Sequence, residues 1–137
     1  MGKRAVAHTA LITQNSDKAN AVECTKLALK APGRRVLRLT RLRYDEPHRP
    51  IALEEVVLPL DRFPGLTADA SDITELAQCF DLSLGRACEH VSIVPANKDV
   101  AAHLGIAVWA NVMKLDRIVE TADGKPIEWR VTFRKID

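Results

Sequence analysis

Cysteine and aromatic residues are scarce in this sequence of 137 residues, which has three cysteines and an aromatic content of 4%. Cys24, Cys79 and Cys88 are odd in number and lack the paired spacing of a zinc site or a redox motif. Each stands among apolar neighbours, so we expect three free thiols that are buried or half-buried. The four histidines have no metal-ligand spacing either. We therefore predict neither a metal nor a cofactor.

Long apolar runs are also missing. No stretch approaches the roughly 18 residues that a membrane-spanning helix requires. The first residues, MGKRAVAHTALITQ, contain only a short, broken apolar segment without a cleavage-like ending, which argues against a secretory signal. The sequence thus predicts a cytoplasmic protein. Its length suits a single domain spanning residues 1–137, because folded units cluster at about 100–150 residues.

The chain has no strong excess of charge of either sign, with a formal net charge of +2. Such a balance does not predict nucleic-acid binding by the chain as a whole, although eight basic side chains lie between Lys26 and Arg49. A nucleic-acid groove could use this cluster, but it would also need interleaved aromatic residues, and only Tyr44 is near. The basic cluster needs another explanation.

The first half of the chain predicts a β-α-β-β unit. Its expected elements are a strand at 8–13, a helix at about 17–29 that ends before Pro32-Gly33, and strands at 36–43 and 51–58. A loop and a helix beginning at Ser71 or Asp72 follow, with Ile73, Leu76, Ala77 and Phe80 on one helical face. Asp72 and Glu75 have the spacing of a capping box.

The second half predicts the same order of elements. We expect a strand at 88–94, a short helix capped by Asn97, and a hairpin of strands 112–119 and 127–134. Asp123-Gly124 is a strong hairpin signal, because the tight turn requires positive φ.

The two hairpin segments VLRLTRLRYDEPHRPI, from Val36, and VMKLDRIVETADGKPI, from Val112, resemble each other in register. Positions that coincide are Leu39 and Leu115, Arg41 and Arg117, Leu42 and Ile118, Pro50 and Pro126, and Ile51 and Ile127. Any two amphipathic hairpins look somewhat alike, but this spacing favours an internal repeat of residues 8–58 and 88–134, joined by a loop and helix at 59–82. The pattern predicts an α+β fold with about six mainly antiparallel strands and packed helices.

Arginines continue rows of aliphatic residues in these strands. Because side chains alternate across a strand, Arg41 and Arg43 share a face with Leu37 and Leu39, and Arg117 shares one with Leu115. A guanidinium withdrawn from water needs a carboxylate, a carbonyl or a bound anion. Glu54, Glu55 and Glu128 are the candidate partners within the protein. The alternative to a bound anion is that the arginines form internal salt bridges with such residues or reach solvent at the strand ends. Two like charges about 7 Å apart on one face favour an external anion as well.

Nucleophilic catalysis has little support, because no histidine stands in a recognisable serine or cysteine motif, and we predict no catalytic residues. Trp109, beside Val108 in an expected loop, is the best hint of a protein-interaction patch. A tryptophan at such a place more often packs over a core edge or at a dimer seam.

The ordered set of motifs resembles the UTRA effector-binding domain of the HutC branch of GntR transcription regulators. The matching segments run through nearly the whole chain: Val36–Arg43 ending in Arg-Leu-Arg, Pro50–Glu54, Leu58-Pro59, Phe63–Leu66, Leu104–Ile106, Leu115–Arg117 and Asp123–Glu128. No single motif is specific, but their order is. The resemblance implies a chorismate-lyase-like fold and a sensor that is not an enzyme. A chorismate-lyase-like enzyme acting on an aromatic carboxylate is the alternative.

The resemblance also implies site residues and partners. By motif, Arg41 and Arg43 would hold the anionic end of a small metabolite, such as a sugar phosphate or an organic acid. Glu54 would take its hydroxyl or amino groups, Glu128 and Phe133 would line the same pocket, and Ser71 is the nearest match to a phosphate-contacting serine. Arg117 is the equivalent arginine of the second unit. We expect a homodimer that contacts DNA only through a winged helix-turn-helix domain missing from this chain.

Two departures from the family pattern affect these expectations. The first hairpin carries His48-Arg49 and one extra residue where the family usually has Asp-Gly, which would displace Glu54. Phe133 stands where tyrosine is common and lacks its hydroxyl.

Overall fold

The computed structural model describes residues 8–45, 48–66 and 72–136. The elements, in chain order, are β1 (His8–Lys18), α1 (Ala21–Lys26), β2 (Arg35–Asp45), β3 (Arg49–Pro59), the 3-10 helix η1 (Leu60–Arg62), α2 (Ile73–Cys79), β4 (Leu84–Pro95), α3 (Lys98–Leu104), β5 (Asn111–Thr121) and β6 (Pro126–Lys135).

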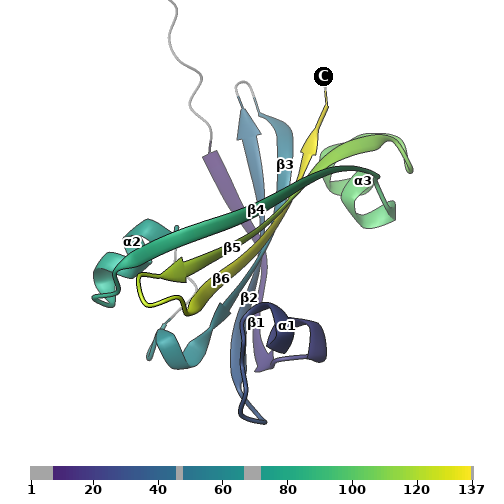
Figure 1. The fold of residues 1–137 in the computed structure, drawn as a ribbon. Coiled ribbons are helices and arrows are strands. Elements are labelled where there is room, and N and C mark those ends of the chain that lie inside the picture. The colour runs from purple at the N-terminus through teal and green to yellow at the C-terminus, as the bar shows by residue number, and fades with distance from the viewer. Residues whose placement is uncertain (1–7, 46–47, 67–71, 137) are drawn as a thin grey trace, which may run out of the picture.

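One six-stranded antiparallel sheet, in the order β1-β2-β3-β6-β5-β4, organises the molecule (Figure 1). The first three strands form one half of the sheet and the last three form the other. The order β-α-β-β occurs twice along the chain, as expected, with α2 between the two occurrences. The expected α+β fold is confirmed.

The two long hairpins have the same register. Arg41 lies opposite Glu54 in the first hairpin, and Arg117 lies opposite Arg130 in the second. Each hairpin also has an irregularity at the same place, between Arg43 and Tyr44 and between Val119 and Glu120. The central pair β3–β6 sets Glu55 against Val131, which occupy corresponding positions of the two hairpins. The two halves are therefore related by an approximate two-fold axis near this pair.

The two faces of the sheet carry different helices. On one face, Ile73 and Leu76 of α2 pack with Phe63 against a cluster that includes Leu37 and Leu58. On the other face, α3 packs through Val100 and Leu104 on Leu42 and Leu53. Leu27, at the end of α1, packs on Val36 and Val57 of that same face. α2 and α3 each bury an apolar stripe on the sheet, as short amphipathic helices must do to be stable. The buried residue within α1 is Glu23.

The start of α1 differs from the expectation. The segment expected to be a turn and the beginning of the helix continues β1 instead, with Asn15 opposite Arg38 and Lys18 opposite Arg35. The helix begins only after Asn20, which forms a capping box with Glu23. Asp17 is a plausible cap by residue type, but its backbone is taken up by pairing with β2. The caps expected at Asp72 and Asn97 are confirmed.

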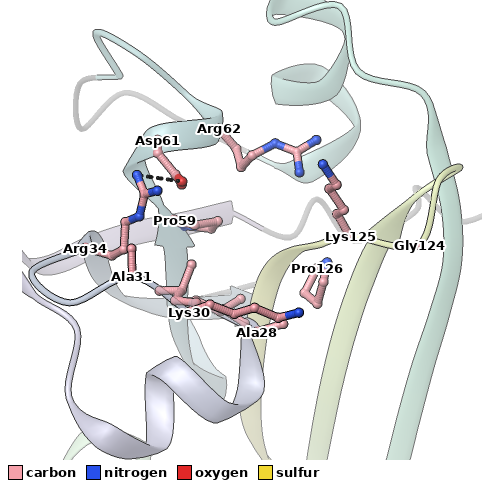
Figure 2. A pocket seen from close by; sticks show the side chains of 12 residues that line it. Ala28, Lys30, Ala31, Arg34, Pro59, Asp61, Arg62, Gly124, Lys125 and Pro126 are labelled. Carbon is pink, nitrogen blue, oxygen red and sulfur yellow. Dashed lines mark ion pairs between the residues drawn. The ribbon is translucent and has the colours of Figure 1, made fainter.

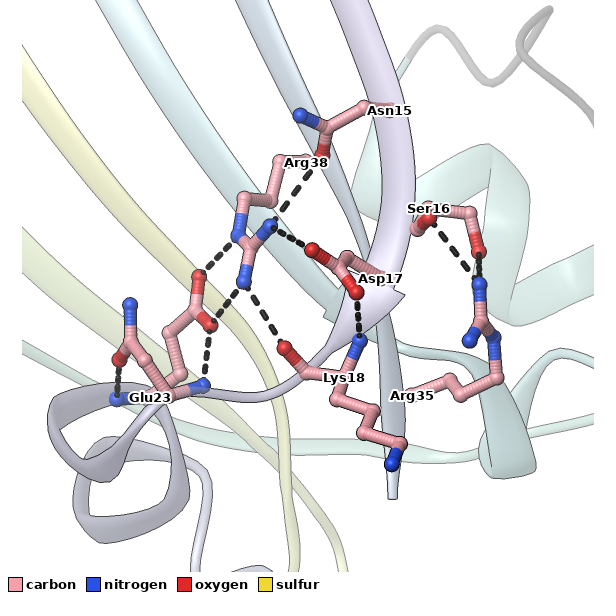
Figure 3. Close-up of polar contacts among 8 residues, drawn as sticks. Asn15, Ser16, Asp17, Lys18, Glu23, Arg35 and Arg38 are labelled. Atoms are coloured by element: carbon pink, nitrogen blue, oxygen red, sulfur yellow. Dashed lines mark hydrogen bonds and ion pairs between the residues drawn. The ribbon is translucent and has the colours of Figure 1, made fainter. Parts of the chain in front are cut away.

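The ion pair between the buried Glu23 and the partly exposed Arg38 holds α1 on the sheet (Figure 3). Arg38 donates from Nε and Nη2 to the two carboxylate oxygens at 2.6 and 2.8 Å, and from Nη2 to the carbonyl of Lys18 at 3.0 Å. The hydrogen bonds from Arg38 are the main reason why the pKa of Glu23 lies below its ordinary value.

Two of the thiols are more accessible than the sequence suggested. Cys24 is half-buried as expected, but Cys79 and Cys88 are exposed. Cys79 ends α2 and Cys88 lies on the edge strand β4, so apolar sequence neighbours did not imply burial. Trp109 is also exposed, at 64% of its surface. Within the described segments, no helix is long and apolar enough to cross a membrane.

Candidate effector-binding site

On one face of β2, a row of apolar side chains is followed by two arginines. Leu37 and Leu39 belong to the core under α2, and Arg41 follows them on the same face. Arg41 is only 7% exposed, which is unusual for a permanently charged residue. Arg43, two positions further on, has a side chain that is 45% exposed. One guanidinium is thus buried and its neighbour reaches toward solvent.

Glu54 of β3 lies between these arginines. It stands directly opposite Arg41 in the register of β2 and β3. Its two carboxylate oxygens lie 3.5 Å from Arg41 Nε and 3.5 Å from Arg43 Nη1. The carboxylate is itself buried, so it compensates charges that water cannot reach.

A second buried carboxylate continues the network from β6. Glu128 is 1% exposed and accepts hydrogen bonds from Arg117 Nη2 at 3.1 Å and from Arg130 Nη2 at 3.0 Å. Arg130 also lies 3.7 Å from Glu54, through Nη1. Arg130 therefore joins the two glutamates into one network that spans four strands.

These charges surround a recess of about 350 Å³ on the α2 face of the sheet. We call it the arginine recess; its lining residues are Arg43, Ile51, Ala52, Glu54, Glu89, Leu115, Arg117, Arg130, Thr132 and Arg134. Together with the adjoining Arg41 and Glu128, it holds five arginines and three glutamates. Positive charge remains in excess, so the recess attracts anions.

Burial disfavours the charged form of Arg41. Desolvation lowers the pKa of its guanidinium, Arg130 and Arg43 add to the decrease, and Glu54 and Glu128 oppose it. Nε of Arg117 and Nε of Arg130 are buried and have no hydrogen-bond partner within the described segments. An anion bound in the recess would relieve the repulsion among the arginines and could accept hydrogen bonds from them.

Five of the seven residues expected at the site lie together: Arg41, Arg43, Glu54, Arg117 and Glu128. Phe133 does not join them. It packs with the α3 cluster on the opposite face, because residues 128 and 133 are an odd number of positions apart on one strand. The expectation that Phe133 lines the same pocket as Glu128 is therefore wrong. Ser71 lies outside the described residues.

Sequence reasoning missed Arg130, Thr132 and Arg134, which follow Glu128 at alternate positions of β6. The alternation of side chains along a strand could have indicated them, because it places Glu128 and these three residues on the same face of β6. Glu89 was also missed; it lies opposite Arg117 on the edge strand β4. Among the described residues, no group of three histidine, cysteine or acidic side chains could hold a metal ion.

A larger hollow of about 530 Å³ lies at the other end of β3 (Figure 2). Lys30, Arg62 and Lys125 lie around it, and Arg34 pairs with Asp61 at 3.5 Å. Loops and turns supply most of these residues, and none of the residues expected at the site is among them. The arginine recess, with buried charges fixed on neighbouring strands, is the better candidate for a specific small-molecule site.

The fold of this chain matches those of known proteins. The chain is similar, at 26% identity and a TM-score of 0.89, to the ligand-binding domain of a protein from Bordetella bronchiseptica assigned to the GntR family of transcriptional regulators. That match covers 100% of this chain and 87% of the other.

Two further structures share the fold. A GntR-family transcriptional regulator from Enterococcus faecalis has 21% identity and a TM-score of 0.85, with 93% of this chain and 92% of that chain covered. PhnF from Mycobacterium smegmatis has 24% identity and a TM-score of 0.85, with 95% of this chain but 59% of that chain covered.

The profile of the UTRA domain matches residues 3–137, nearly the whole sequence. This match, the fold and the likeness to a GntR ligand-binding domain support a role in binding a small-molecule effector. The chain belongs to the UTRA domain family.

Proposed function

We propose that this UTRA domain senses a small anionic metabolite, a sugar phosphate or an organic acid, which binds in the arginine recess. The excess of arginine over glutamate in a partly buried recess carries the proposal. Arg43 is accessible enough to meet a ligand, and planar guanidinium groups suit carboxylate and phosphate through paired hydrogen bonds. Glu54 and Glu128 would accept hydrogen bonds from hydroxyl or amino groups of the ligand.

In this proposal the domain is part of a transcription regulator of the HutC branch, and ligand binding changes the activity of that regulator. In this proposal the domain forms a homodimer in the cytoplasm and contacts DNA only through an attached winged helix-turn-helix domain. An effector that binds one dimer arrangement better than another shifts the population toward it, whereas a ligand with equal affinity for both shifts nothing. The similarity to regulators of the GntR family supports this role.

The proposal does not include catalysis, and a chorismate-lyase-like enzyme is the alternative. We expect no turnover of chorismate, because the chain is similar to the ligand-binding domain of a transcriptional regulator. Incubation with chorismate, followed by detection of 4-hydroxybenzoate and pyruvate, tests this. Formation of those products at a rate dependent on Arg43 would favour the enzyme.

A thermal-shift screen of glucose 6-phosphate, inorganic phosphate, citrate and urocanate tests the sensor proposal. We expect at least one of these anions, or a close relative, to raise the melting temperature, and Arg43→Ala to abolish the increase. Arg86→Ala is the matched control, because Arg86 is 75% exposed and lies outside the arginine recess. Equal shifts in both variants would remove the recess from the proposal.

A further inference from the structure

A second recess lies on the opposite face of the sheet from the arginine recess. It has a volume of about 460 Å³, and β2, β3, β5 and β6 form its floor. Asn20 and Glu23, at the beginning of α1, border it. We call it the α1 recess. Its volume falls within the range of about 300–1,000 Å³ that is usual for small-molecule sites.

Glu55 lies near the centre of this floor. On β3 it stands between Thr40 of β2 and Val131 of β6, at the approximate two-fold axis of the sheet. Its side chain is accessible, yet within the described segments it has no hydrogen bond and no ion pair. Desolvation by the neighbouring side chains is the main cause that raises the pKa of this carboxyl, while the charge of Asp99 adds to the increase and that of Lys114 opposes it. A cationic ligand group would supply the compensation that the protein does not provide.

Lys114 brings the opposite charge to the same recess. It lies on β5, opposite Phe133, so β6 separates it from the strand that carries Glu55. With strands about 4.8 Å apart, the two backbones are separated by about 10 Å. No described carboxylate lies within ion-pairing distance of Lys114. Glu55 and Lys114 thus face one recess as separate, unpaired charges of opposite sign.

The other two charged residues that line the α1 recess, Glu23 and Arg38, compensate each other. Asp99 of α3 is not among the lining residues and lies 3.5 Å from His103. Arg38 is paired with Glu23 through two short hydrogen bonds (Figure 3). Asp116, near the recess, accepts a hydrogen bond from the Trp129 indole at 2.9 Å and lies 3.8 Å from Lys26. These pairs leave one negative and one positive group for a ligand, which together favour a molecule of zero net charge.

The strand between those two charges presents an apolar surface. Trp129, Val131 and Phe133 lie at alternate positions of β6 and all line the α1 recess. The hydrogen bond from Trp129 to Asp116 fixes the indole, and Lys26 Nζ lies 5.7 Å from its ring centroid. A preformed apolar wall with few polar groups is the usual construction of a ligand pocket.

We infer that the α1 recess binds a small zwitterion, an α-amino acid with an apolar side chain. Glu55 receives its ammonium group, Lys114 receives its carboxylate, and its side chain lies against Trp129 and Phe133. This site is independent of the arginine recess, because the two recesses lie on opposite faces of the sheet and share no lining residue.

Fluorescence of Trp129 tests the inference directly. The chain has two tryptophans, so the Trp109→Phe variant retains Trp129 as the only indole reporter. The probes are L-phenylalanine, 2-phenylethylamine, which lacks the carboxylate, and 3-phenylpropionate, which lacks the amine. We expect a saturable change with L-phenylalanine and affinities at least about tenfold weaker for the two other probes, because each forgoes one charge-assisted hydrogen bond.

Two substitutions in the Trp109→Phe variant distinguish the role of Glu55 from that of Lys114. Glu55→Gln should weaken binding of L-phenylalanine at least about tenfold and leave 3-phenylpropionate unchanged, whereas Lys114→Met should weaken both of these probes. Far-UV circular dichroism verifies that both variants fold. Arg43→Ala should leave the L-phenylalanine affinity unchanged, so this result does not depend on the proposed sensor function.

Three outcomes would overturn the inference. One is the absence of a saturable change with L-phenylalanine. Another is an L-phenylalanine affinity that Glu55→Gln does not alter. The third is loss of binding in Arg43→Ala with retention in Glu55→Gln, which would place the amino acid in the arginine recess.

Discussion

The side chain of Arg43 combines accessibility with a fixed position. Its partner Glu54 is buried and holds it at 3.5 Å, while nearly half of its own side chain reaches solvent. Arg41 differs, because it is buried and belongs to the internal charge network. Under the proposed function, Arg43 would meet the anion directly, and Arg41 would act from the internal charge network.

Replacing Arg43 by alanine should weaken effector binding by more than about 1.5 kcal/mol, because a charge-assisted hydrogen bond to the anion is lost. The fold should survive, since the guanidinium is largely exposed. Titration calorimetry with the anion found in the thermal-shift screen measures the change. Unchanged affinity would remove Arg43 from the site.

Glu128 differs from Arg43 because its side chain is buried and is hydrogen-bonded to arginines of the protein. Glu128→Gln should reduce the free energy of unfolding by about 2–4 kcal/mol, since Arg117 and Arg130 would lose their buried countercharge. Urea denaturation measures the loss. Glu120→Gln provides a control, because the ion pair of Glu120 is with the exposed Arg86, at 3.7 Å. Similar losses in the two variants would contradict a structural role of the buried network.

At the scale of elements, α1 is too short to be stable by its own propensity and depends on its contacts with the sheet. Its capping box satisfies the first backbone groups, and the pair of Glu23 and Arg38 fixes it to β2. Leu27 adds an apolar contact at the helix end. The position of α1, and hence the wall of the α1 recess, depends on these contacts, among which the ion pair of Glu23 and Arg38 is the polar link to β2.

The pH dependence of stability should report this ion pair. Because the folded-state pKa of Glu23 is lowered, its contribution is fully present above the ordinary glutamate pKa and is lost as the pH falls through the folded value. Glu23→Gln should therefore cost about 2–3 kcal/mol at neutral pH, and progressively less in acid. Urea denaturation from pH 7 to pH 3 tests this; a constant difference would contradict it.

Gly85 makes the beginning of the edge strand β4 sensitive to side-chain size. A Cβ atom there would meet the carbonyl oxygen of Thr121 and lie 2.9 Å from Cα of Ala122, both of which are backbone atoms. Gly85→Ala should lower stability by about 1–3 kcal/mol, because backbone has to move. Ala87→Ser on the same strand is the control for thermal unfolding. A Gly85→Ala protein as stable as the control would argue against this close packing.

At the scale of the whole molecule, the sheet separates two recesses by its two faces. The α2 face combines an apolar core with the arginine recess, and the other face supports α1, α3 and the α1 recess. The strands β3 and β6 contribute to both recesses through alternate residues. β2 and β5 also supply residues to both recesses, so four shared strands connect the two sites.

Ligand binding should stabilise the whole domain. An effector present at about 100 times its dissociation constant should add about 2.7 kcal/mol to the free energy of unfolding, provided it binds only the folded state. Urea denaturation with and without the anion measures this increment. Arg43→Ala at the same anion concentration should show a smaller one; equal increments would place the anion elsewhere.

The sequence by itself determined the order of elements, the helix caps at Asp72 and Asn97, and the arginine rows of β2 and β5. These features depend on local rules, namely side-chain alternation, turn residues and capping. Only the tertiary structure decided that Glu54 and Glu128 meet across Arg130, that Asn20 begins α1, and that Phe133 faces α3. Those outcomes depend on strand register and on neighbouring strands that are distant in the sequence, which local patterns do not specify.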